Sequence, residues 1–131
     1  MRILDLRRLV GQEGEAAAEA YLRRQGYRIV ARNVRSSLGE LDLVAEDKDV
    51  LVFVEVKARR TREFGGAVYA VDGRKQNKLI RLAAHYLARH HLTHRACRFD
   101  VVLLQADEAG GGLRIEHIRN AFEVSGDDLR W

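Results

Sequence analysis

The sequence predicts a single α/β domain in which helices pack on a mixed β-sheet, in the order α-β-β-β-α-β-β. Three observations lead to this prediction. A length of 131 residues suits one compact domain, which we take to be residues 1–131. Apolar residues recur at helical spacing in two segments and alternate in several others. The run Val50–Lys57 is almost continuously apolar and β-branched, which is typical of a central strand buried on both faces.

The first predicted element is a helix over Leu9–Gln25. Its apolar stripe consists of Val10, Gly14, Ala17, Ala18, Tyr21 and Leu22. Gly26 follows where a helix C-terminal cap is expected. The early Gly11 and Gly14 weaken the start of the helix, so its N-terminus could lie one turn later.

Three strands are predicted next, over Tyr27–Asn33, Leu38–Glu46 and Val50–Lys57. A polar turn separates the second strand from the third, so these two are expected to pair as a hairpin. Simple alternation divides the second strand into two faces, one with Leu41, Leu43 and Ala45 and the other with Glu40, Asp42 and Val44.

The second half of the chain is predicted to begin with a basic, glycine-containing loop over Ala58–Gly73. A helix follows over Arg74–His91, with an inward stripe of Leu79, Ala83, Tyr86 and Leu87. Cys97–Gln105 and Leu113–Ile118 are the last two predicted strands. Their position after the second helix completes the mixed sheet.

Composition narrows the classes of function. Charged residues make up 32% of the chain, and no apolar run approaches the roughly 20 residues needed to span a bilayer, so we expect no contact with a membrane. The single cysteine, Cys97, excludes an intrachain disulfide and favours a reducing compartment, hence the cytoplasm. A net charge of +4 and a pI of about 9.6 favour a polyanionic partner such as nucleic acid.

The predicted central strand carries the residues with chemical potential. An acid and a base, Glu55 and Lys57, interrupt it two residues apart and therefore share one face. Asp42 lies on the adjoining strand, so the two carboxylates can lie close together and bind a hard divalent cation, with the Val56 carbonyl as a further ligand. Such a cation activates water for phosphodiester hydrolysis, and Lys57 could orient that water or neutralise negative charge. The alternative is a hairpin whose charges are solvated or paired.

Two segments resemble a known family. The motifs are Gly39-Glu40-Leu41-Asp42-Leu43-Val44-Ala45 and Phe53-Val54-Glu55-Val56-Lys57-Ala58-Arg59. They resemble the YraN-like (UPF0102-type) family of bacterial proteins, which is itself similar to archaeal Holliday junction resolvases and other PD-(D/E)xK nucleases. The resemblance covers most of the chain. It implies a restriction-endonuclease-like fold, with Asp42 and Glu55 as metal ligands and Lys57 as the catalytic lysine. Leu41 stands where the family name has proline.

The same resemblance places a metal-associated acid on the first helix, where Glu15 is the best match; the alternative is a solvated helix glutamate. Glu40 shares a face with Asp42 and could bind a second metal or pair with an arginine. Lys75 and Gln76 could face a phosphate at the start of the second helix, or simply fray there. Residues expected to contact DNA phosphates, as an alternative to solvation in a basic loop, are Arg59, Arg60, Arg62 and Arg74.

The expected function is that of an endonuclease that uses Mg²⁺ or Mn²⁺ to hydrolyse phosphodiester bonds in DNA, with branched or damaged DNA as candidate substrates. Cutting both strands symmetrically would call for two copies of the site and hence a homodimer. One alternative is a nucleic-acid-binding module that keeps the fold without catalysis. Another is a structural protein whose charges only solvate its surface.

Overall fold

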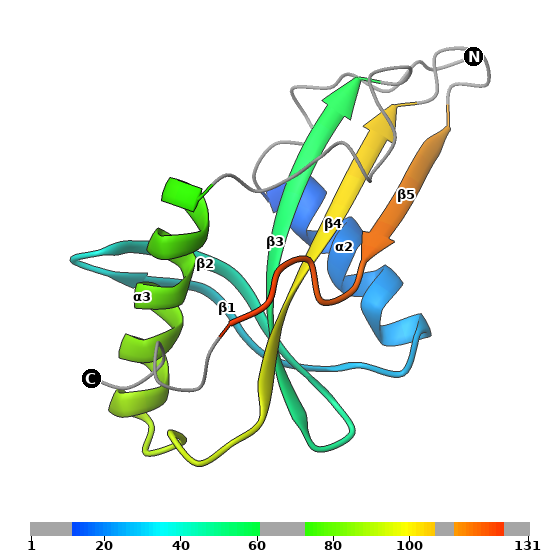
Figure 1. The fold of residues 1–131 in the computed structure, drawn as a ribbon. Coiled ribbons are helices and arrows are strands. Elements are labelled where there is room, and N and C mark those ends of the chain that lie inside the picture. Colours follow the sequence, from blue (N-terminus) through cyan, green and yellow to red (C-terminus); the bar gives the residue numbers. More distant parts are fainter. Residues whose placement is uncertain (1–11, 61–72, 107–111, 125–131) are drawn as a thin grey trace.

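The structure is a computed structural model that describes residues 12–60, 73–106 and 112–124 (Figure 1). Its elements are α2 (Gln12–Arg24), β1 (Arg28–Ser36), β2 (Gly39–Asp47), β3 (Val50–Arg60), α3 (Gly73–Arg89), β4 (Cys97–Ala106) and β5 (Leu113–Ile118). The predicted order of helices and strands is confirmed. Within the described ranges, neither helix combines the length and apolar character needed to cross a membrane.

The strands form one five-stranded sheet in the order β1-β2-β3-β4-β5. β3 and β4 are parallel, and α3 makes the crossover between them, whereas the other neighbouring strands are antiparallel. The sheet is therefore mixed, as predicted. β3 lies at its centre, and α2 and α3 lie on opposite faces of the sheet (Figure 1).

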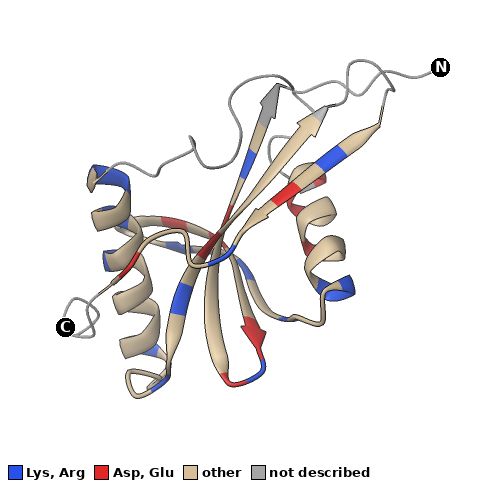
Figure 2. Ribbon diagram, turned by 45° about the vertical axis from the view of Figure 1, so that its right-hand side comes forward, with Lys and Arg blue, Asp and Glu red and all other residues tan. Residues whose placement is uncertain are grey.

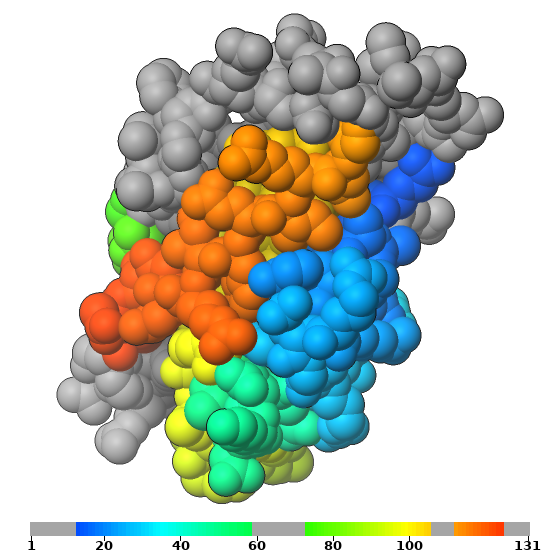
Figure 3. Space-filling model, turned by 90° about the vertical axis from the view of Figure 1, so that its right-hand side faces the viewer, coloured from blue at the N-terminus to red at the C-terminus, as the bar shows by residue number. Residues whose placement is uncertain are grey.

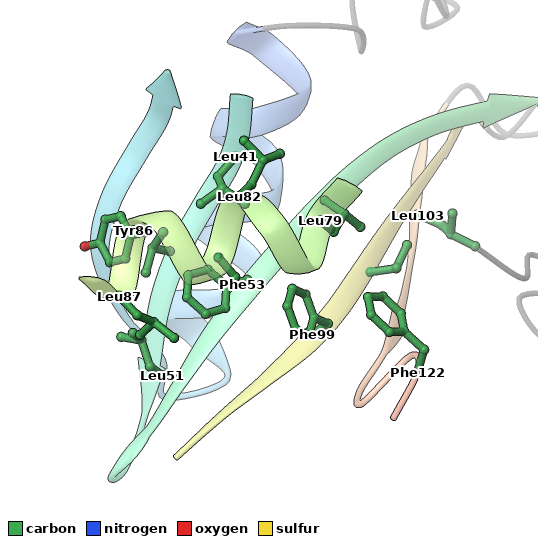
Figure 4. Close-up of a cluster of buried hydrophobic side chains, with 13 residues drawn as sticks. Leu41, Leu51, Phe53, Leu79, Leu82, Tyr86, Leu87, Phe99, Leu103 and Phe122 are labelled. Atoms are coloured by element: carbon green, nitrogen blue, oxygen red, sulfur yellow. The ribbon is translucent and has the colours of Figure 1, made fainter. Parts of the chain in front are cut away.

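Alternation along β3 directs side chains into two separate cores. On one face, Leu51 and Phe53 pack beneath α3, and Phe53 stacks on Phe99 with ring centroids 5.4 Å apart (Figure 4). On the other face, Val52 and Val54 pack beneath α2. A strand buried on both faces explains why the run from Val50 onward is almost entirely apolar, and why charges within it call for an explanation.

The end of α2 is set by glycine. Gly26 has a φ of +93°, which side chains other than glycine rarely adopt. Its N–H donates to the Arg23 carbonyl, and the Tyr27 N–H donates to the Leu22 carbonyl, both at 3.0 Å. These two bonds form a Schellman motif, which satisfies helix carbonyls that would otherwise lack partners. The cap predicted at Gly26 is confirmed, and it turns the chain directly into β1.

Several predicted boundaries differ from those in the structure, and the differences in β1 and β3 matter most. Tyr27 belongs to the helix-ending motif, so β1 begins at Arg28 and runs on to Ser36 rather than ending at Asn33. β3 continues past Lys57 to Arg60, because the parallel ladder with β4 still pairs Arg60 with Ala106. The first three residues of the expected basic loop are therefore strand. The rest of that loop, including Arg62, and residues 9–11 of the first helix lie outside the described residues.

The predicted alternation of β2 is also wrong. Leu41 packs with Val44 beneath α3, whereas Leu43 packs beneath α2, so the two faces exchange at Asp42. The neighbouring strand bends at the same level, where Asn33 has a φ of +50°. Asparagine tolerates this left-handed conformation better than most residues. The bend carries the β1–β2 hairpin away from the sheet plane and toward α3 (Figure 1).

A buried polar network fixes the opposite side of the sheet. The Asp100 carboxylate accepts hydrogen bonds from Arg98 Nε at 3.0 Å, His117 Nε2 at 2.8 Å and the Asn120 N–H at 3.0 Å. Tyr27 also donates to it, at 3.2 Å. The network joins β4 and β5 to the end of α2, and Figure 3 shows α2 and β5 side by side on this face. Because both oxygens of Asp100 accept hydrogen bonds within the fold, we assign this carboxylate a structural role.

We expect Phe53→Ala to lower the free energy of unfolding by about 3–5 kcal/mol, because it opens a cavity among close-packed rings. Denaturant titration monitored by circular dichroism measures the effect. Val30→Ala is the control, since Val30 is 37% exposed and its truncation should change stability by less than about 0.5 kcal/mol. Equal losses in the two variants would contradict the assignment of Phe53 to the core.

We expect Asp100→Asn to cost about 3 kcal/mol at pH 7, because it leaves buried partners without their counter-charge. Burial pushes the pKa of Asp100 upward, but the bonds from His117, Arg98 and Asn120 outweigh burial and leave that pKa below its ordinary value. The contribution of ionised Asp100 to folding stability is therefore present at pH values above the pKa of an aspartate in the unfolded chain, about 3.9. It is lost as the pH falls through the lower pKa of Asp100 in the folded protein. Urea titrations from pH 7 to pH 3 should show the gap between variant and wild type closing below about pH 4, while the exposed Asp49→Asn shows no gap.

Candidate metal centre

The candidate site lies where β2 and β3 separate. Their ladder runs from Asp47↔Val50 to Leu43↔Val54, and beyond it β3 continues alongside β4. At the separation, the Val56 N–H donates to Asp42 Oδ2 at 2.9 Å. The side chain of Asp42 thus takes the place that a backbone carbonyl of β2 would occupy in a continued ladder. This bond fixes the Asp42 carboxylate next to β3.

Glu55 lies on the α3 side of β3, in line with Leu51 and Phe53. It is only 9% exposed, although it is a carboxylate in a central strand. Its Oε1 forms an ion pair with Lys75 Nζ at 2.8 Å. Its Oε2 is buried and has no hydrogen-bond partner among the described residues. A buried acceptor without a partner is costly and typically marks a place for a water or an ion.

Glu15, Glu40 and Asp42 form an acidic cluster where β2 and β3 separate. One carboxylate oxygen each from Glu15, Glu40 and Asp42 lie within 4.8 Å of one another, an arrangement that could hold a metal ion. Glu15 comes from α2, and Glu40 and Asp42 come from β2. The structure therefore brings the helix acid Glu15 close to the strand acid Asp42. Glu40 is also paired with Arg35 at 2.9 Å, so the arginine partner considered for it exists.

Burial, together with repulsion between carboxylates, raises the pKa of two acids of this cluster, Asp42 and Glu15. The pKa of Asp42 is raised, chiefly by burial and also by Glu55 and Glu40, while the bond from Val56 opposes the shift. The pKa of Glu15 is raised by burial, by Asp42 and by Glu40, against a hydrogen bond with Asn33. Carboxylates crowded in this way favour either a proton or a bound cation. The residues present therefore suit a hard divalent cation with oxygen ligands.

Lys57 is half-buried beside these acids. Burial lowers its pKa, with Lys75 acting in the same direction and Glu55 and Asp42 opposing it. Because both carboxylates act on its pKa, the Lys57 ammonium group lies near Glu55 and Asp42. A lysine with a lowered pKa next to carboxylates is typical of a group that exchanges protons or binds an anion.

The other predicted site residues divide into three groups. Lys75 reaches the site through its ion pair with Glu55, and Gln76 follows it, partly buried, on α3. Arg74 lies exposed at the start of α3. Arg59 and Arg60 belong to the end of β3, where the backbone alone is described, and Arg62 lies outside the described residues.

One residue escaped prediction. Asn33 combines a left-handed backbone conformation with a side-chain hydrogen bond to Glu15, so it shapes the bend and orients an acid of the cluster. The available signal is an asparagine at the predicted end of the strand Tyr27–Asn33, because asparagine is a residue type that tolerates a left-handed backbone conformation.

A mixed sheet flanked by two helices, with acids gathered where two strands separate, defines an α/β protein with a candidate divalent-metal site. The chain belongs to the uncharacterised protein family UPF0102, whose family model matches residues 14–104. This membership confirms the resemblance drawn from the motifs around Asp42 and Glu55.

Curated relatives extend the match over nearly whole chains. A UPF0102 protein of Pelotomaculum thermopropionicum is 49% identical over 118 residues, covering 90% of this chain and 98% of that protein. One from Symbiobacterium thermophilum is 51% identical over 117 residues, covering 89% and 98%. A solved structure of SfsA from Pyrococcus furiosus in complex with Ca²⁺ is similar over 82% of this chain and 60% of that one, at 16% identity and a TM-score of 0.37.

We expect Mn²⁺ to raise the melting temperature of the protein, because a ligand that binds only the folded state stabilises it by about 2.7 kcal/mol at 100 times its Kd. Asp42→Asn should abolish the rise, since Asp42 is adjacent to every other acid of the cluster. Without metal, Glu15→Gln should be more stable than wild type, because the raised pKa of Glu15 means that its ionised form is disfavoured by folding.

Differential scanning fluorimetry over a range of Mn²⁺ concentrations measures these effects, and the exposed Glu123→Gln serves as the control. The cluster would lose its assignment as a metal centre if millimolar Mn²⁺ stabilised Asp42→Asn as much as wild type. Comparing Glu55→Gln with Glu40→Gln shows which acid shares the ion with Asp42.

Proposed function

We propose that this protein is a metal-dependent endonuclease that hydrolyses phosphodiester bonds in DNA. The observation that carries the proposal is the buried Glu55, which keeps one carboxylate oxygen without a partner beside Asp42 and Lys57. Burial of an acid on a central strand is hard to explain by stability, because desolvation of its charge is costly. A site that must hold a cation and a reacting phosphate supplies the missing reason.

In the proposed site, Asp42, Glu55 and the carbonyl of Val56 hold Mg²⁺ or Mn²⁺. The Val56 N–H points to Asp42, and in an extended strand the C=O of a residue points to the same side as its N–H. The Val56 carbonyl therefore faces the gap between β2 and β3. Glu55 could ligate through Oε2 while Oε1 stays with Lys75. When bound, the metal would lower the pKa of a ligated water and offset charge on the phosphate.

The chain's own side chains would do the remaining work. Lys57, whose pKa is lowered by burial, would orient the attacking water, accept its proton or neutralise the developing charge. Glu15 would assist from α2, where it adjoins Asp42. Lys75 and Gln76 would face the phosphate from the start of α3. Contacts to the rest of the backbone are proposed for Arg59, Arg60, Arg62 and Arg74.

One observation favours a second candidate, a nucleic-acid-binding module without catalysis. Lys75 already neutralises Glu55 through a short ion pair, so the buried acid has a counter-charge in the absence of metal. In that case, the same basic surroundings would bind DNA and the acids would serve only to shape the site. The two candidates differ in one measurable property, which is cleavage that depends on metal.

We expect wild-type protein to cut labelled linear, nicked, flapped or four-way-junction DNA with Mg²⁺ or Mn²⁺. Glu55→Gln and Lys57→Ala should each lower the rate by at least about 100-fold, because both remove groups proposed to act on the reacting atoms. Comparing the four substrates identifies the preferred DNA structure, with branched or damaged DNA as the candidates.

Arg28→Gln is the control for the cleavage assay, since Arg28 is exposed and pairs with Glu46 far from the cluster. It should cut at the rate of wild type. Folded wild type that binds DNA but cuts none of these substrates would favour the binding module. Symmetric cutting of both strands would further call for a homodimer, which sedimentation with and without DNA tests.

A further inference from the structure

The exposed side of α3 carries a line of basic residues, four of them Arg or Lys and one His. Arg74, Lys78, Arg81, His85 and Arg89 follow one another at intervals of four, three, four and four residues. At 3.6 residues per turn, these intervals place all five within about 80° of one another around the helix. Four of them are exposed and His85 is half-buried, while the buried Leu79, Ala83 and Leu87 occupy the opposite side. We call these five residues the α3 stripe.

Acids of the chain do not offset this charge locally. No Asp or Glu occurs between Gly73 and Phe99. Several arginines elsewhere are neutralised, for example Arg32 by Glu19 and Arg95 by Glu46. Among the described residues, no ion pair engages Arg74, Lys78, Arg81 or Arg89. Like charges three and four residues apart destabilise a helix, so the stripe lowers stability in a way that an external anion would relieve. Figure 2 shows this contrast, with blue but no red on α3 and both colours on α2.

The stripe starts at the candidate metal centre. Lys75, next to Arg74, pairs with Glu55, and the Lys78 side chain runs over Gly39 at the beginning of β2. Its far end borders a hollow between α3 and β1. Basic side chains line this hollow, namely His85, Arg89, His90 and Arg35, the last of which is paired with Glu40. Positive charge therefore continues from the acidic cluster along the whole helix.

The length of the stripe sets the size of its ligand. Arg89 lies 15 positions after Arg74, which at a rise of 1.5 Å per residue gives about 22 Å along the helix axis. Duplex DNA carries a phosphate on each strand about every 3.4 Å of its axis, so this distance corresponds to about six base pairs. A small anion or nucleotide would engage only part of it.

We propose that the α3 stripe is a track for the phosphate backbone of a DNA duplex arm, leading about six base pairs away from the metal centre. The substrate class rests on the proposed function, but Lys78, Arg81, His85 and Arg89 lie outside the site that would do chemistry. Contacts of this kind position the duplex without selecting its sequence. The protein therefore requires a double-stranded arm on one side of the point where it acts.

The test is DNA binding in EDTA, where no metal-dependent cleavage occurs and success does not depend on nuclease activity. The stripe variant Lys78→Gln/Arg81→Gln/Arg89→Gln is compared with a control variant, Arg23→Gln/Arg24→Gln/Arg28→Gln. Both variants reduce the net charge from +4 to +1 (4 − 3 = 1). The control residues lie at the end of α2 and the start of β1, away from α3. Fluorescence anisotropy gives the affinity for duplexes of graded length.

At about 0.1 M salt, the stripe variant should bind a long duplex at least about tenfold more weakly than wild type. Its slope of log K against log salt should fall by about 2 to 3, which is about 0.9 for each phosphate that the variant no longer neutralises. The control should change affinity less than about twofold. Wild-type affinity should rise as the duplex lengthens to about 22 Å, and the stripe variant should show little of that rise.

Equal losses in the two variants would show that net charge alone matters and would overturn the track, as would unchanged binding by the stripe variant or no binding by wild type. Thermal melting guards against misfolding, since removal of like-charge repulsion should leave the stripe variant at least as stable as wild type. Tight binding through the stripe in EDTA, together with no cleavage when Mg²⁺ or Mn²⁺ is supplied, would keep this inference and reject the nuclease.

Discussion

The hydrogen bond from the Val56 N–H to the Asp42 carboxylate lies at the point on which the rest of the site depends. Two antiparallel strands that part from each other leave backbone donors and acceptors without partners, and such groups are costly when buried. The Asp42 side chain satisfies one such donor at the fork, which is the point where β2 and β3 separate. Because the same carboxylate still has lone pairs to offer, the residue that closes the ladder is also the one around which Glu15, Glu40 and Glu55 gather.

The fork requires a rigid frame on both sides. Toward α2, the frame is the saturated carboxylate of Asp100, which fixes β4, β5 and the turn after α2 by hydrogen bonds rather than by packing alone. Toward α3, it is the stack of Phe53, Phe99 and Phe122, with ring centroids 5.4 and 4.8 Å apart. The two buried acids of the central strands thus differ in kind. Asp100 has a partner for each oxygen, whereas Glu55 keeps one oxygen unpaired.

The sequence predicted the elements well because their signals are local. Continuous apolar character marked β3, helical spacing marked both helices, and Gly26 marked the end of α2. It predicted Asp42, Glu55 and Lys57 as candidates because charges in buried strands are unusual. It did not predict the exchange of faces at Asp42, since alternation assumes a regular strand and the left-handed Asn33 breaks that regularity. The ion pair of Lys75 with Glu55 joins a helix start to a strand across a crossover, which no local pattern specifies.

The proposed mechanism needs negative charge to bind the metal and positive charge to bind the DNA phosphates. Carboxylates that bind a metal ion also repel a phosphate. A site built from acids alone would therefore attract the metal but repel the DNA phosphate of the proposed substrate. In this fold, α2 contributes an acid to the cluster and α3 contributes only bases. The two helices cover opposite faces of the sheet. Both reach the point where β2 and β3 separate, because the side chains of β2 exchange faces at Asp42 there. The bend at Asn33 and Asp42 therefore brings the acidic cluster next to the basic start of α3. The proposed mechanism needs both, because acids would hold the metal and bases would hold the phosphate backbone.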